Sequence, residues 1–298
     1  MTETVETKSP AITQEMINLY DEYTHLTLDR RGFMDKLGRL AGGSAAAAAI
    51  VPMLAADKAH AAVFAPDDAR IVTERVSFPS ADETELSGLL AKPKDAAGKL
   101  PAVLVIHENR GLNPHIEDVT RRFATEGFLA LGIDLLSRSG GTPADEDQAR
   151  NMIGKLAPEA SLTDAIAAVE YLKANPASNG KVGVIGFCWG GGLVNRIAVA
   201  APDLAAGVAY YGMQPPAGDV PKIKAKLMLH YAGLDDRINA GIPAYEAALK
   251  SAGVDYQVFV YEGANHAFNN DTSAARYDKK AADLAWSRTV AFLKANLG

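Results

Sequence analysis

The single cysteine of this 298-residue chain, Cys188, lies in the sequence Gly-Phe-Cys-Trp-Gly at positions 186–190. The short β-branched run at 181–185 predicts a strand before it, and the small residues at 191–200 predict a helix after it. A side chain at a tight strand-to-helix turn is presented at the end of a sheet, and flanking glycines let strand and helix approach closely. A lone cysteine is more often a small buried hydrophobe, but this position predicts a nucleophile.

A cysteine nucleophile needs a base that removes its proton, and the base needs a group that orients it. His266 follows the strand-like run at 256–261, and Asp235 follows the strand-like run at 225–231. Nucleophile, acid and then histidine is an order along the chain that hydrolases use. We therefore predict His266 as the general base and later acid, and Asp235 as the residue that orients its imidazole, in preference to Asp236.

The remaining histidines do not suggest a metal site. His107 and Glu108 end a strand-like run, and the second histidine that a helical zinc motif needs four residues later is missing. The chemistry predicted for Cys188 requires neither a metal nor an organic cofactor.

Strand-like and helical segments alternate along the chain, and this alternation predicts an α/β fold. Strands are expected at 71–78, 85–91, 102–107, 129–134, 181–185, 206–211, 225–231 and 256–261, and helices at 116–126, 162–174, 191–200 and 274–295. Such an order is typical of a mostly parallel sheet flanked by helices, with reactive residues on loops at the carboxyl ends of the strands.

The chain from about residue 70 to 298 resembles the dienelactone hydrolase family, also called carboxymethylenebutenolidases, within the α/β-hydrolase superfamily. Four motifs carry the resemblance: Gly-Phe-Cys-Trp-Gly-Gly at 186–191, His-Glu-Asn-Arg-Gly at 107–111, Asp-Leu-Leu-Ser-Arg at 134–138 and Tyr-Glu-Gly-Ala-Asn-His-Ala-Phe at 261–268. A cysteine at the tight strand-to-helix turn, here called the elbow, combined with a glutamate-bearing loop is fairly specific to this family.

The resemblance implies an α/β-hydrolase fold and roles for further residues. Glu108 matches a glutamate that contacts the resting cysteine and gives way when substrate arrives. The backbone N–H groups of Asn109 and Trp189 are the expected oxyanion-hole donors. Arg138 matches an arginine that binds the substrate carboxylate, whereas the position of a second such arginine is occupied by Asn270.

The sequence therefore predicts a hydrolase of small-molecule esters or lactones that works through a Cys-His-Asp triad and a thioester intermediate. One alternative is a broad-specificity esterase or acyl transferase, because an acceptor other than water can intercept a thioester. Another is a non-enzymatic redox-sensing or ligand-binding protein that uses Cys188 as an oxidisable thiol. The presence of Asp235 and His266 disfavours the non-enzymatic alternative.

The first sixty residues carry a different kind of signal. Arg30 and Arg31 precede an Ala-rich stretch at 37–54 and an Ala-His-Ala sequence at 59–61, which together resemble a twin-arginine export signal with its cleavage site. We predict that residues 1–61 form this signal and that 62–298 form one catalytic domain, exported to the periplasm of a bacterium by the twin-arginine machinery. The alternative is a cytoplasmic protein that retains an N-terminal extension.

Composition agrees with these predictions. The chain is 48% hydrophobic and 22% charged, and its net charge of −6 disfavours a nucleic-acid partner. One cysteine cannot form an internal disulfide, so export leaves the thiol available. The Ala-rich stretch is shorter than the roughly 20 strongly apolar residues of a membrane-spanning helix, so no stable span is expected in the mature protein. The sequence makes no prediction of an oligomeric state.

Overall fold

The computed structural model describes residues 11–25, 27–55 and 64–298. These residues fall into two compact units. One contains the described residues before position 58 together with Ser273–Arg276, and the other contains the rest of the chain. No single helix of the described residues has the length and composition of a membrane-spanning helix. One pair of consecutive helices meets both criteria together, but the two helices are bent by 108° at the break between them.

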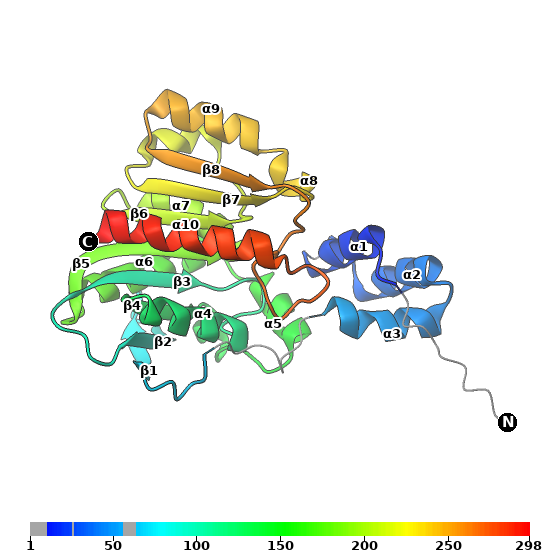
Figure 1. Ribbon diagram of the computed structural model, residues 1–298, viewed down its shortest axis with the longest axis horizontal. Coiled ribbons are helices and arrows are strands. Elements are labelled where there is room, and N and C mark those ends of the chain that lie inside the picture. Colours follow the sequence, from blue (N-terminus) through cyan, green and yellow to red (C-terminus); the bar gives the residue numbers. More distant parts are fainter. Residues whose placement is uncertain (1–10, 26, 56–63) are drawn as a thin grey trace. The chain divides into compact units, whose positions relative to one another are not determined.

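The larger unit is built on one eight-stranded sheet (Figure 1). Its order is β1-β2-β4-β3-β5-β6-β7-β8; β1 pairs antiparallel with β2 and β2 with β4, and all other pairs are parallel. The bounds are β1 Ile71–Pro79, β2 Glu85–Pro93, β3 Leu100–Ile106, β4 Leu129–Asp134, β5 Ser178–Phe187, β6 Ala206–Tyr210, β7 Lys226–Ala232 and β8 Tyr256–Tyr261.

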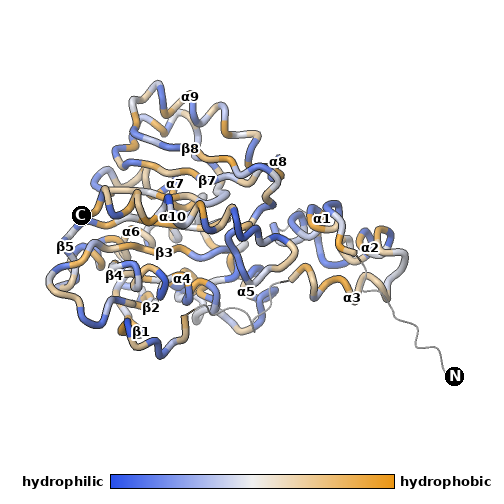
Figure 2. The backbone as a smooth tube through the Cα atoms, viewed as in Figure 1, coloured by the Kyte–Doolittle hydropathy of each residue, from blue (hydrophilic) through white to orange (hydrophobic). Residues whose placement is uncertain are grey.

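Helices cover both faces of this sheet, because its central strands are apolar on both sides. Every residue of β4 and β6 is buried, and Figure 2 shows hydrophobic colour along the inner strands. One face packs against α4 (Pro114–Thr125) and α10 (Lys279–Leu297). The other packs against α6 (Pro158–Ala174), α7 (Trp189–Ala200) and α9 (Ile242–Ala252). Two shorter helices, α5 (Glu146–Ile153) and α8 (Asp236–Asn239), and two 3-10 turns, η2 (Ser137–Ser139) and η3 (Ala217–Lys222), lie in the connections.

The predicted α/β-hydrolase class of fold is confirmed, and all eight predicted strands are present. Three helices of this unit were not predicted. α5 and α8 are short, and α9 begins close behind α8, although the proline in its first turn is a helix-start signal. The closing helix begins at Lys279 rather than 274, because the carboxylate of Asp278 accepts a hydrogen bond from the Ala281 N–H and caps the helix there.

The smaller unit contains three helices, α1 (Gln14–Thr24), α2 (Arg30–Ala41) and α3 (Ser44–Leu54). Their apolar faces form a separate core in which the rings of Tyr23 and Phe33 stack at 4.6 Å. The predicted twin arginines occupy the first turn of α2, where the Asp29 side chain caps the helix by accepting the Gly32 N–H at 2.7 Å. The predicted cleavage site at 59–61 lies outside the described residues, so export stays a prediction.

Candidate active site

Cys188 sits in a strained turn between β5 and α7. Its φ of 55° and ψ of −116° lie in a region that side-chain-bearing residues rarely adopt. Its N–H is bonded to the carbonyl of Tyr210 at 3.0 Å, which ties the turn to β6. A Cβ on Gly186 would lie 2.3 Å from the carbonyl oxygen of Gly190, so glycine is required for strand and helix to approach this closely. The thiol-bearing residue is 7% exposed.

The loops after β7 and β8 bring the predicted acid and base together. The imidazole Nδ1 of His266 lies 2.5 Å from Oδ2 of Asp235. The other oxygen of this carboxylate accepts the N–H of Ile238 at 3.2 Å, which fixes the carboxylate plane. A ring nitrogen of His266 lies within 4.8 Å of the Cys188 sulfur. His266 therefore lies next to both Cys188 and Asp235, as the predicted triad requires.

Two further residues lie near the predicted triad. Asp236, the less favoured orienting residue, is exposed at the start of α8. The ring of Tyr211 lies 4.9 Å from the His266 ring, and Tyr211 is held at a positive φ of 39° just after β6. Tyr211 is not among the site residues predicted from the sequence. Tyr211 comes directly after a buried strand, at the same sheet edge as the loops of the predicted triad, and this position could have indicated a site residue.

Glu108 is buried in the loop after β3 and is held by an amide. Its Oε2 accepts a hydrogen bond from Nδ2 of Asn270 at 2.8 Å. Asn270 is oriented in turn by Thr272, which donates to Oδ1 from its N–H at 3.1 Å and from its hydroxyl at 2.6 Å. Within the part of the chain that the structure describes, the other Glu108 oxygen is buried without a hydrogen-bond donor. Asn270, which stands where the resemblance leads one to expect an arginine, thus holds the Glu108 carboxylate, which the resemblance predicts to move when substrate binds.

The two predicted oxyanion-hole donors come from two places, the first turn of α7 and the loop after β3. Trp189 is the first residue of α7, and the first N–H groups of a helix have no partner within the helix. Asn109 follows Glu108 in the loop after β3. Both positions match the expected placement of the two donors, one after the nucleophile and one after the third strand.

Arg138 lies in an ion-pair cluster on η2. Its guanidinium donates to Asp164 at 2.6 and 2.7 Å and to Asp82 at 2.7 and 3.0 Å, with further bonds to Thr84 and Ser80. The bonds to Asp164, followed by those to Asp82, raise the pKa of Arg138. All three guanidinium nitrogens of Arg138 are therefore bonded to protein groups. The role of Arg138 in binding a substrate carboxylate stays a prediction.

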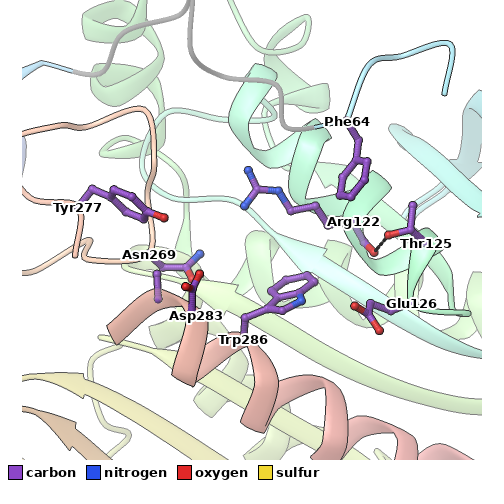
Figure 3. A pocket seen from close by; sticks show the side chains of 9 residues that line it. Phe64, Arg122, Thr125, Glu126, Asn269, Tyr277, Asp283 and Trp286 are labelled. Carbon is purple, nitrogen blue, oxygen red and sulfur yellow. Dashed lines mark hydrogen bonds between the residues drawn. The ribbon is translucent and has the colours of Figure 1, made fainter. Parts of the chain in front are cut away.

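A pocket of about 230 Å³ lies between α4 and α10 (Figure 3). Its lining does not include Cys188, Asp235 or His266; it comprises Phe64, Arg122, Thr125, Glu126, Asn269, Tyr277, Ala282, Asp283 and Trp286. Asn269 lines this pocket, whereas its neighbour Asn270 bonds to Glu108. Adjacent residues of one loop thus serve two separate environments.

Comparison with known proteins decides the family. The sequence model of the dienelactone hydrolase family matches residues 86–297. The chain belongs to the dienelactone hydrolase family. It is 31% identical over 233 residues to carboxymethylenebutenolidase of Pseudomonas putida, covering 75% of this chain and 97% of that protein. A Saccharolobus solfataricus protein that carries the same name provisionally is 32% identical over 260 residues, covering 74% of this chain and 98% of its own.

Solved structures agree with this assignment. A Klebsiella pneumoniae crystal structure, provisionally titled a dienelactone hydrolase, superposes with a TM-score of 0.69 at 28% identity, covering 75% of this chain and 98% of that one. This dienelactone hydrolase family member is accordingly a hydrolase. A second family model, described as YqhI-like, matches residues 4–42, a range that includes the twin arginines.

Proposed function

We propose that this family member hydrolyses ester or lactone bonds of small molecules, with Cys188 as nucleophile, His266 as general base and Asp235 as its orienting acid. The observation that carries the proposal is the arrangement at the elbow. A strained Cys188 lies within 4.8 Å of a ring nitrogen of His266, whose Nδ1 is bonded to a buried Asp235. The carboxymethylenebutenolidase name of the relative from Pseudomonas putida supports a lactone or ester as substrate.

The reaction follows from these positions. Because Nδ1 of His266 donates to Asp235, the neutral ring has its lone pair on Nε2, which takes the thiol proton. The sulfur then forms a bond to the carbonyl carbon, and the carbonyl electron pair moves to oxygen, next to the N–H groups of Trp189 and Asn109. Collapse of this intermediate breaks the bond to the alcohol oxygen, which receives the proton from His266.

The second half of the reaction regenerates the thiol. The acyl group remains on Cys188 as a thioester. His266 removes a proton from water, the hydroxide oxygen bonds to the thioester carbon, and the carbon–sulfur bond breaks as the sulfur takes back the proton. Asp235 stabilises the imidazolium that exists between the two proton transfers.

We propose, as the family resemblance implies, that Glu108 acts on the Cys188 thiol through its charge. A carboxylate near a thiol disfavours the thiolate, whereas a protonated histidine and the N-terminus of α7 favour it. Asn270 holds one oxygen of Glu108 with a neutral donor, so movement of Glu108 requires breaking one side-chain bond. We propose that this movement accompanies substrate binding, as the family resemblance implies.

The test is capture of the intermediate. Wild type, Cys188→Ala and His266→Asn are mixed with a chromogenic short-chain ester, quenched in acid and analysed by mass spectrometry. We expect one acyl group on Cys188 in the wild type, none in Cys188→Ala, and turnover lost in both variants. Product analysis with an added alcohol separates hydrolysis from acyl transfer. Full turnover by Cys188→Ala would refute the proposal.

We also propose that residues 1–61 direct export and that the mature enzyme begins at Ala62. The proposal rests on Arg30 and Arg31 and on the Ala-His-Ala sequence at 59–61. A retained extension, consistent with the separate core of α1, α2 and α3, is the competing interpretation.

A further inference from the structure

His107, the residue that follows β3, is fully buried, and both of its ring nitrogens are engaged. Nδ1 lies 2.6 Å from the carbonyl oxygen of Glu108, and the N–H of Leu135 donates to Nε2 at 3.3 Å. Because a backbone N–H can only donate, Nε2 carries the lone pair. The hydrogen of the neutral ring is therefore on Nδ1, from which it is donated to Glu108.

The hydrogen bond from His107 to the Glu108 carbonyl fixes the orientation of the whole Glu108–Asn109 peptide group. A trans peptide is planar, and its C=O and N–H point in opposite directions. The carbonyl of Glu108 shares its peptide plane with the N–H of Asn109, which is one of the two expected oxyanion-hole donors. Holding the carbonyl toward the buried imidazole therefore directs the Asn109 N–H away from it.

The same ring contacts the second half of the oxyanion hole. The imidazole of His107 stacks on the indole of Trp189, with centroids 5.7 Å apart and planes 9° from parallel. The backbone of His107 also faces the elbow, since a Cβ on Gly190 would lie 2.4 Å from the His107 carbonyl oxygen. One buried side chain thus touches the loop after β3, the end of β4 and the first residue of α7.

The charge state of His107 suits a fixed donor. Burial lowers its pKa, and this effect outweighs the opposing influence of the Glu108 carbonyl and of the charges on Asp134 and Glu108. The ring is neutral at neutral pH, so its single hydrogen stays on Nδ1. With both nitrogens bonded to backbone groups, His107 is not placed to relay protons to substrate.

We propose that His107 is a positioning residue of the oxyanion hole: its neutral imidazole orients the Glu108–Asn109 peptide and, by stacking, the residue after the nucleophile. This inference rests on the proposed function, because it assigns His107 a part in the same acyl transfer. It predicts that loss of the donor weakens stabilisation of the tetrahedral oxyanion, whereas the reactivity of the thiol is preserved.

Two variants separate the donor from the ring. His107→Asn keeps an N–H on the atom attached to Cγ, where the imidazole has Nδ1, but loses the ring. His107→Phe keeps a stacking ring but has no donor. We expect kcat of His107→Phe to fall about 10- to 100-fold, less than the roughly 100- to 1,000-fold of deleting a donor outright, with KM changed less than threefold. His107→Asn should recover most of that loss.

Two readouts distinguish positioning from a structural defect. Affinity for a trifluoromethyl ketone, which forms a tetrahedral oxyanion adduct on the thiol, should fall in parallel with kcat/KM in His107→Phe. Alkylation of Cys188 by iodoacetamide creates no oxyanion, and its rate should stay within about twofold of wild type.

The outcomes are separable from those of the proposed function. Wild-type kcat in folded His107→Phe overturns the inference, and so does a loss shared equally by oxyanion-adduct affinity and alkylation rate. If His107→Phe does not fold, the carbonyl stretch of the acyl-enzyme decides. In wild type and His107→Asn, hydrogen bonds from the oxyanion hole should shift this stretch to low frequency. In His107→Gln, whose amide is one carbon further from the backbone, the shift should be smaller. An unchanged shift in His107→Gln overturns the inference. Failure of the proposed function would instead appear as turnover by Cys188→Ala.

Discussion

The amide of Asn270 donates to the buried carboxylate of Glu108 at 2.8 Å, at the position where the family resemblance leads one to expect an arginine. An arginine would bring a full positive charge to Glu108. The neutral amide brings a single hydrogen bond, and Thr272 fixes which end of the amide faces the carboxylate. The carboxylate is thus held less strongly than a salt bridge would hold it, which leaves it freer to move.

Replacing Asn270 by Leu should destabilise the protein, because it removes the donor from a buried carboxylate at similar side-chain volume. We expect a loss of about 1–3 kcal/mol in the free energy of unfolding, measured by urea denaturation at pH 7. Asn269→Leu is the matched control, since Asn269 is equally buried but makes no side-chain hydrogen bond within the described residues. Equal losses in both variants would show that the bond to Glu108 contributes nothing particular.

Asp235 and Asp236 offer a second matched pair. Asp235→Asn should reduce kcat on the order of 1,000- to 10,000-fold, because an amide no longer holds the imidazole with its hydrogen on Nδ1. Asp236→Asn should stay within about twofold, because Asp236 is exposed at the start of α8. Steady-state kinetics on a chromogenic ester measure both. A large effect of Asp236→Asn alone would reverse the assignment of the orienting acid.

Much of this architecture was predictable from local patterns. The inner strands are short apolar runs, and Cys188, Asp235 and His266 follow three of the parallel strands. The rule that carboxyl ends of parallel strands share one edge therefore places these residues together. The Gly-rich elbow was equally legible, because a Cβ at Gly186 or Gly190 would clash with backbone atoms.

Contacts that depend on packing were not predictable from local patterns. Nothing near Arg138 in the sequence indicates that Asp164 and Asp82 bond to it, because these residues come from α6 and from the turn between β1 and β2. The bond from Leu135 to His107 likewise joins the ends of two strands and identifies the imidazole tautomer only in three dimensions. Pairings between distant segments need the folded chain.

Arg138→Ala tests the ion cluster. The side chain of Asp164 is 1% exposed, so removing the guanidinium leaves a buried carboxylate with fewer donors. We expect the free energy of unfolding to fall by about 3 kcal/mol, and Asp164→Asn in the same background to restore part of it. The ratio of kcat/KM for a carboxylate-bearing ester to that for a neutral ester tests the predicted substrate role. A ratio unchanged from wild type would remove Arg138 from the substrate site.

Export has a direct test in a bacterial host with a twin-arginine system. The full-length chain should yield periplasmic protein that begins at Ala62, and changing Arg30 and Arg31 to Lys should leave the precursor in the cytoplasm. N-terminal sequencing and fractionation measure both outcomes, with a cytoplasmic marker enzyme as control. Active cytoplasmic protein that begins at Thr2 would establish a retained extension instead.

Acid sensitivity should depend on His230, which is buried in β7 between the hydroxyls of Tyr261 and Thr289. Burial, with a smaller contribution from the charge of Arg288, lowers the pKa of His230 to about 3. The unfolded chain binds a proton at this histidine near its ordinary pKa of about 6.5, whereas the folded chain does not. Stability from this group is therefore complete above pH 6.5 and is lost as pH falls toward 3.

His230→Gln should reduce that dependence on pH. By linkage, one such group contributes a slope of up to about 1.4 kcal/mol in the free energy of unfolding per pH unit within this window. Urea denaturation of wild type and His230→Gln at pH 7, 5.5 and 4 measures the slope. The variant can be less stable at pH 7, because it alters the bonds to Tyr261 and Thr289, so the difference between the two slopes is the decisive quantity. Parallel slopes would show that His230 is protonated in the folded protein as readily as in the unfolded chain.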